Sequence, residues 1–307
     1  MNTTIIAIHG HGLKPERDVL DDLWREALTH GVRRHQKNAL KTFEAARWEF
    51  VYFNDLTEPF LAGNGETLDS TLDHADRRHS FEQLKSRKKK SFTSRRVYER
   101  LPGQSALGEF IADVGQPLLR SVGLGRLLID QYAPSYIEYW ENQRASVLAR
   151  ATAALQAAME RGDRITVLAH CLGSVVAYDA FWTLQHDPSF ERFRDRKVHH
   201  WITMGSPLGD ETVKRHLLGA DRPLLERYPH NVLHWTNVHA EDDYIAHDNT
   251  VANDFQPMLA QRLISTIEDT EILNLAVRYG RSNPHNAVGY LVSPSVARAV
   301  CAALTPP

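Results

Sequence analysis

The sequence has little of several features that would place it in a specialised class. Only two of its 307 residues are cysteine, too few for the disulfide framework of a small secreted protein. No stretch of about 18 uninterrupted apolar residues occurs, so no membrane-spanning helix is predicted. The first residues, MNTTIIAIHGHG, lack the basic flank and the long apolar core of a signal peptide. We therefore expect a cytoplasmic protein in a reducing compartment.

An excess of charge of one sign is also missing. The chain has 36 Lys and Arg residues against 38 Asp and Glu residues, so no nucleic-acid partner is expected. The exception is residues 85–100, where one acidic residue accompanies eight basic ones: Lys85, Arg87, Lys88, Lys89, Lys90, Arg95, Arg96 and Arg100. Such a run is usually a solvated surface. Its alternative role is contact with an anionic partner such as lipid headgroups or an acidic carrier protein.

What the sequence does contain is an alternation of strand-like and helix-like segments. Runs rich in β-branched residues predict strands at 3–8, 49–53, 164–169, 200–204, 232–238 and 271–277. Amphipathic segments predict helices at 15–30, 135–161, 172–184 and 296–304. This alternation predicts an α/β fold with a mostly parallel central sheet and helices on both faces. Such sheets bind ligands at the carboxyl ends of their strands.

The segment between the second and third expected strands is too long for a simple crossover connection. We therefore expect a single domain over residues 1–307 that carries residues 57–134 as an insertion. Within the insertion, residues 114–129 are rich in Gly and Leu. They would form either a lid over the site or part of the insertion's own core.

The most informative string is ITVLAHCLGSVVAYD, from Ile165 to Asp179. It has the pattern small-x-nucleophile-x-Gly where a strand meets a helix, and such a turn points its central side chain out of the sheet. The string resembles the nucleophile elbow of the α/β-hydrolase superfamily, in which lipase- and esterase-like members read AHSLGS. The resemblance covers most of the chain outside the insertion. Ala169 stands in place of the first Gly of the motif, and Cys171 in place of the serine.

The resemblance implies that an acid and then a histidine follow the nucleophile along the chain. Asp243 comes after the fifth expected strand and precedes Tyr244-Ile245-Ala246, as the acid does in that superfamily; Asp242 is the competing candidate. His285 lies in the loop before the last helix, where the base is expected. The implied triad is Cys171, His285 and Asp243.

The turn His9-Gly10-His11-Gly12 after the first strand is expected to help form an oxyanion hole. One backbone N–H would come from Leu172, directly after the nucleophile, and the other from His11, with Gly10 and Gly12 as alternates. His9 and His11 also form an H-x-H pair that a metal could use. No third ligand is evident beside them, so neither a metal nor another cofactor is expected. The later turn TMGSPL, residues 203–208, resembles one that packs beside the active site in lipase-like proteins.

These residues favour a hydrolase of carboxylic esters or thioesters that forms a covalent acyl-enzyme on Cys171. Its substrate would be a small-molecule or lipid acyl compound. An acyltransferase would use the same acyl-enzyme with a different acceptor. The alternative from another class is a binding or signalling module with a hydrolase fold, in which Cys171 marks lost chemistry. An engineered replacement of serine also stays open.

Overall fold

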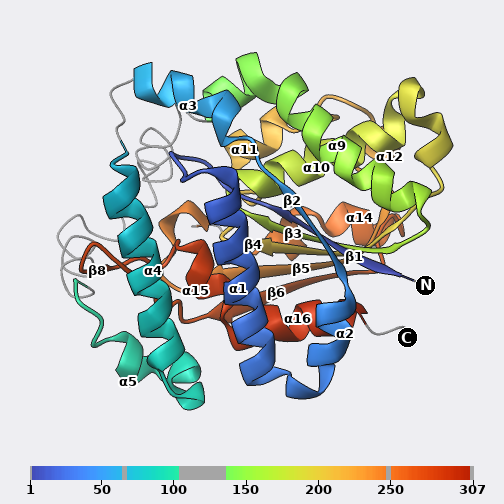
Figure 1. Ribbon diagram of the computed structural model, residues 1–307. Coiled ribbons are helices and arrows are strands. Elements are labelled where there is room, and N and C mark those ends of the chain that lie inside the picture. Colours follow the sequence, from blue (N-terminus) through green and yellow to red (C-terminus); the bar gives the residue numbers. More distant parts are fainter. Residues whose placement is uncertain (1, 64–67, 104–135, 247–249, 305–307) are drawn as a thin grey trace, which may run out of the picture.

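The computed structural model of the chain describes residues 2–63, 68–103, 136–246 and 250–304 (Figure 1). A central sheet lies between two layers of helices, with α9 and α10 on one side and α1 and α16 on the other (Figure 1). This confirms the predicted α/β class. The stretch 114–129, named as a lid or insertion core, lies outside the described residues.

The sheet has six strands in the order β2-β1-β3-β4-β5-β6, and every neighbouring pair is parallel. The strands are β1 Thr3–Ile8, β2 Arg47–Val51, β3 Arg164–His170, β4 Val198–Met204, β5 Val232–Ala240 and β6 Thr266–Ile272. Because all run the same way, their carboxyl ends gather at one edge of the sheet. The loops that carry the predicted site residues leave from that edge.

Both faces of the sheet are buried, which explains the continuous apolar runs of its central strands. Alternate residues of β1 point to opposite faces. Ile6 and Ile8 join the core with α9 (Arg144–Glu160) and α10 (Leu172–His186). Ile5 and Ala7 join the core with α1 (Arg17–His35) and α16 (Pro294–Leu304). The core is therefore two apolar layers separated by the sheet.

The remaining helices and short strands lie in the connections. They are η1 Lys37–Ala39, α2 Leu40–Ala45, α3 Asn54–Gly63, α4 Ser70–Ser86, η2 Lys89–Thr93, α5 Arg95–Tyr98, the π-helix η3 Tyr139–Gln143, η4 Pro188–Phe193, α11 Glu211–His216, α12 Leu224–Arg227, η5 Tyr244–Ala246, α13 Val251–Asp254, α14 Gln256–Ala260, β7 Val277–Arg278, β8 Arg281–Ser282 and α15 Ala287–Leu291. β7 and β8 pair as a separate antiparallel ribbon. No helix among the described residues combines the length and apolarity needed to cross a membrane.

The described part of the insertion is attached to the rest of the chain by buried ion pairs. Arg278 of β7 binds Asp73 of α4 at 2.7 Å and also pairs with Asp76. Arg77 completes the group by binding Asp73 at 2.5 Å. The basic run continues from the end of α4 through η2 and α5. Two of its members pair with carboxylates, Lys85 with Glu82 and Arg95 with Glu241.

The sixth strand is not where the apolar pattern placed it. We expected residues 271–277, but β6 covers Thr266–Ile272. As the edge strand it has only two buried apolar residues, Ile267 in the core with α9 and α10 and Ile272 in the core with α1 and α16, and the residues between them are polar. The more apolar Leu275, Ala276 and Val277 leave the sheet and are buried in the helical layer with α1 and α16. Edge position and local packing together outweigh the apolar run.

Candidate active site

Cys171 sits at the sharp turn that joins β3 to α10. Its backbone has φ 54° and ψ −127°, a strained region for a residue with a side chain. Its N–H donates to the Met204 carbonyl at 3.0 Å, which fixes the turn against β4. A Cβ on Gly173 would lie 2.5 Å from the His9 carbonyl oxygen, so only glycine fits there. The small-x-Cys-x-Gly pattern is thus the result of close backbone packing around a forced turn.

The structure pairs His285 with Asp243 and not with Asp242. The Nδ1–H of His285 donates to both carboxylate oxygens of Asp243, at 2.9 and 2.8 Å. Asp243 is fully buried among hydrogen-bond donors, and Tyr290 donates its hydroxyl to Oδ2 at 2.6 Å. Asp242 instead accepts from the Tyr98 hydroxyl at 2.6 Å. Of the two candidate acids, Asp243 is therefore the one that contacts His285.

Two imidazoles lie beside the thiol. Nδ1 of His11 is 2.8 Å from the Cys171 sulfur, and a ring nitrogen of His285 lies within 4.8 Å of it. Since Asp243 occupies Nδ1 of His285, Nε2 is the nitrogen available to the thiol. Nε2 is buried and has no hydrogen-bond partner among the described residues. The Tyr136 hydroxyl lies 3.5 Å from the sulfur.

The charges of this cluster favour a thiolate–imidazolium pair. Burial alone would raise the pKa of the Cys171 thiol, but the neighbouring His11 and His285 rings hold it well below its ordinary value. Burial would likewise lower the pKa of His285. The negative charges of Asp243 and the Cys171 thiolate instead raise it to about 10. The two shifts act together to favour a negative sulfur and a positive His285 ring, the state in which a thiol is nucleophilic.

The turn after β1 approaches Cys171 directly. A Cβ on Gly10 would lie 2.7 Å from the Cβ of Cys171, so this glycine permits the approach. Leu172 is the first residue of α10, and the first N–H groups of a helix have no carbonyl partner within it. The sequence analysis expected His11 to contribute its backbone N–H to an oxyanion hole. In the structure the His11 side chain also contacts the Cys171 sulfur.

His9 does not join His11 in a metal site. Its Nδ1–H donates to the Gly10 carbonyl at 2.7 Å, and its Nε2 accepts from the Phe53 N–H at 3.0 Å. The ring stacks on Phe53 with centroids 4.0 Å apart, and burial lowers its pKa to about 3. Both nitrogens of His9 are used in fixing the turn. The ligand atoms that do converge belong to His11, Cys171 and His285.

Three further residues support the site, and two of them, Lys14 and His170, were not assigned a role from the sequence. Lys14 donates from Nζ to the His11 carbonyl oxygen, and burial lowers its pKa to about 7. His170 donates from Nε2 to the His285 carbonyl at 2.8 Å, and burial lowers its pKa to about 3, so it stays neutral. Gly205, in the TMGSPL turn, has φ 53°, and a Cβ there would lie 2.7 Å from Asp243 Oδ2.

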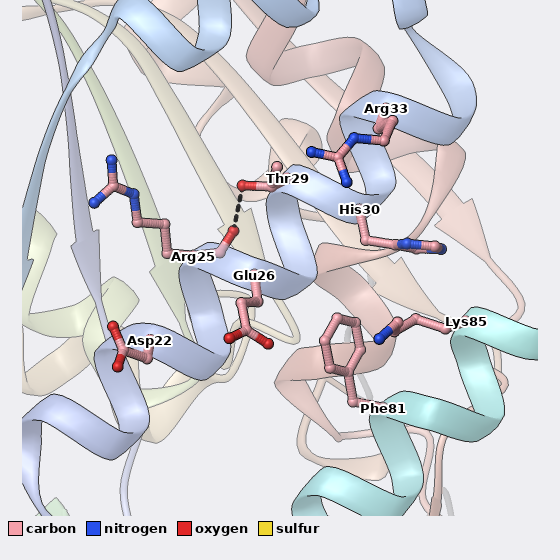
Figure 2. A pocket seen from close by; sticks show the side chains of 8 residues that line it. All are labelled: Asp22, Arg25, Glu26, Thr29, His30, Arg33, Phe81 and Lys85. Atoms are coloured by element: carbon pink, nitrogen blue, oxygen red, sulfur yellow. Dashed lines mark hydrogen bonds between the residues drawn. The ribbon is translucent and has the colours of Figure 1, made fainter.

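A separate groove of about 330 Å³ lies between α1 and α4 (Figure 2). Its side chains include Arg25, Arg33 and Lys85 as well as Asp22 and Glu26. The three basic side chains outnumber the two acidic ones by one, and charges of both signs line the groove. None of its lining residues belongs to the Cys171 cluster.

Comparisons of the chain with protein-family models, with curated proteins and with solved structures find no match. The functional argument therefore depends on the geometry of the site. That geometry is a strained cysteine at a strand–helix turn, a histidine near it, and a buried carboxylate that orients the histidine. Nucleophilic catalysis needs these three parts together.

Proposed function

We propose that the protein is an α/β-hydrolase that cleaves carboxylic esters or thioesters through an acyl-enzyme on Cys171. The observation that carries the proposal is the position of the Cys171 sulfur. It stands at a turn with φ 54°, 2.8 Å from His11 Nδ1 and within 4.8 Å of a nitrogen of His285. Asp243 then holds the far side of the His285 ring at 2.8 Å.

The first half of the reaction uses the existing charge pair. The thiolate attacks the acyl carbon, forming a carbon–sulfur bond as the carbonyl electron pair moves to oxygen. When the intermediate collapses, the bond to the leaving alkoxide or thiolate breaks, and His285 gives that group its proton. The products are a thioester on Cys171, a free alcohol or thiol, and a neutral His285.

The second half restores the thiolate. Neutral His285 takes a proton from a water molecule as the water oxygen attacks the thioester carbon. Collapse then expels the Cys171 thiolate and releases the carboxylic acid, while His285 keeps the proton. Asp243 stabilises the positive ring in both halves and fixes its orientation, the role an orienting acid has in a triad.

The oxyanion of each intermediate would be bound by the backbone N–H groups of Leu172 and His11. Leu172 supplies a donor from the first turn of α10, where the helix dipole also favours negative charge. The loss of one such donor typically costs about 2.7–4 kcal/mol of transition-state stabilisation. Backbone donors cannot be removed by ordinary substitution, so the side chains of the triad give the sharper test.

The test is hydrolysis of a panel of chromogenic esters and thioesters of different acyl length, with intact-mass detection of the acyl-enzyme. Wild type should hydrolyse at least one member of the panel and gain the mass of its acyl group. Cys171→Ala should show neither reaction, and His285→Ala should acylate far more slowly. The matched control is Cys301→Ser, since burial raises the pKa of that thiol to about 11 and it plays no part in the site. Equal rates for wild type, Cys171→Ala and His285→Ala would refute the proposal and favour a non-catalytic module.

A further inference from the structure

The three side chains that would perform this chemistry also have the composition of a zinc site. We propose that His11, Cys171 and His285 bind one Zn²⁺ ion, and that the bound ion holds the enzyme in an inactive state. The binding depends only on the arrangement of the three residues. The inhibition rests on the function proposed above.

The donor types select the metal. One thiolate and two imidazoles suit Zn²⁺, which binds cysteine sulfur and histidine nitrogen in a tetrahedral arrangement. Mg²⁺ and Ca²⁺ require oxygen ligands, and the converging atoms of this cluster are sulfur and nitrogen. Three protein ligands leave a fourth position for water, as in other zinc sites with an open position.

The distances fit with small adjustments of the side chains. Zinc–sulfur bonds of about 2.3 Å and zinc–nitrogen bonds of about 2.0 Å place tetrahedral ligand atoms roughly 3.3–3.5 Å apart. The ligand atoms of His11, Cys171 and His285 all lie within 4.8 Å of one another. The His11 Nδ1 and Cys171 Sγ atoms, now 2.8 Å apart, would separate by about 0.7 Å. A rotation of the His11 ring provides a change of this size.

The surroundings of the ligands also favour a metal. A histidine that binds zinc usually gives its other ring N–H to a carboxylate, which sets the tautomer and orients the ring. His285 already has this arrangement, because its Nδ1–H donates to Asp243 at 2.8 Å. Its Nε2 is buried and has no hydrogen-bond partner among the described residues. Loss of its proton would leave a lone pair directed into a buried space beside the Cys171 sulfur.

Metal binding and catalysis would exclude one another. The ion would take the sulfur lone pair that attacks the acyl carbon and the His285 nitrogen that transfers the proton. Removal of the ion by a chelator should restore both the thiolate and the acid–base group.

The experiment measures binding without substrate. Chelator-treated protein is titrated with Zn²⁺ against a chromophoric competitor and, separately, with Cd²⁺, whose thiolate complex has an ultraviolet charge-transfer band. Wild type and the control Cys301→Ser should bind one ion per chain. Cys171→Ala should lose the band, and His11→Ala and His285→Ala should bind at least about tenfold more weakly. Circular dichroism checks that each variant is folded.

The outcomes separate the two proposals. Absence of the band in wild type, or equal affinity in wild type and Cys171→Ala, would overturn the metal site. Ester hydrolysis that rises when Zn²⁺ is added would overturn the inhibitory role. If the chelator-treated protein hydrolyses no ester but still binds one Zn²⁺ ion per chain, the proposed function is refuted and the ion site is supported.

Discussion

Replacing the buried carboxylate that orients His285 gives the most informative perturbation. Asp243→Asn keeps the size of the side chain and an oxygen that can accept hydrogen bonds, but removes its charge. Burial disfavours a charged His285 ring, yet its pKa is raised from 6.5 to about 10, with Asp243 the largest of the groups that raise it. This difference corresponds to about 5 kcal/mol in favour of the charged ring.

Without that charge, we expect the pKa of His285 to fall to its ordinary range or lower. The ring would then be mostly neutral at pH 7, so the leaving group would lose its proton donor and the thiolate would lose the positive charge of His285. The amide can also present its NH₂ group to the ring, which favours the wrong tautomer. An equivalent change in a serine triad lowers kcat by about 10,000-fold, and we expect a loss of similar size.

The assay is the rate of Cys171 acylation by an activated ester, followed by intact mass across a range of pH. In wild type the rate should change little in the neutral range. In Asp243→Asn it should be much lower and rise with pH as the thiol ionises. The matched control is Asp242→Asn, one residue away, whose carboxylate is bound by Tyr98 and does not contact His285. Identical rates and pH profiles for wild type and Asp243→Asn would refute the triad.

Three further changes test parts of the same account. Tyr290→Phe removes a hydroxyl that donates to Asp243 and accepts from a backbone N–H, and the free energy of unfolding in urea should fall by about 1–3 kcal/mol; an unchanged value would contradict these bonds. Gly205→Ala would place a methyl group 2.7 Å from Asp243 Oδ2 and should lower kcat. The control is Gly280→Ala, since Gly280 also has a positive φ but a Cβ there would have no neighbour within 4 Å, and kcat should not change. The pKa of buried His170 is lowered from 6.5 to about 3, so its contribution to stability is complete above about pH 6.5 and is lost as the pH falls toward 3. His170→Gln should therefore flatten the acid side of the stability profile, and an unchanged slope would be evidence against the buried neutral ring.

Much of the fold could be predicted from the sequence because the central strands are buried on both faces. β1 and β3 appear as apolar, β-branched runs, and β4 and β5 keep enough apolar and β-branched residues among their polar ones to be found close to the predicted positions. The edge strand β6 was misplaced because four polar residues separate its two buried isoleucines, so it has no apolar run. The expected helix at 135–161 contains the π-helix Tyr139–Gln143 before α9, a local change of hydrogen bonding that an apolar pattern does not reveal.

The candidate triad could be predicted because the turn around Cys171 constrains its neighbours. Gly173 is required by contact with the His9 carbonyl, so the motif has a steric cause. The side-chain role of His11 could not be read in the same way, because it depends on how the turn after β1 is rotated toward the sulfur. The contributions of Lys14 and Tyr136 depend on packing between distant segments.

The most direct test of the central claim is the ionisation of Cys171 in the folded protein. It is measured as the pH dependence of its alkylation by iodoacetamide, with Cys301→Ser used so that one thiol remains. We predict an alkylation rate that changes little across the neutral range, with an apparent pKa well below the value of about 8.5 of a free cysteine. In His285→Ala the apparent pKa should rise. Alkylation that follows an ordinary thiol pKa in both proteins would contradict the account.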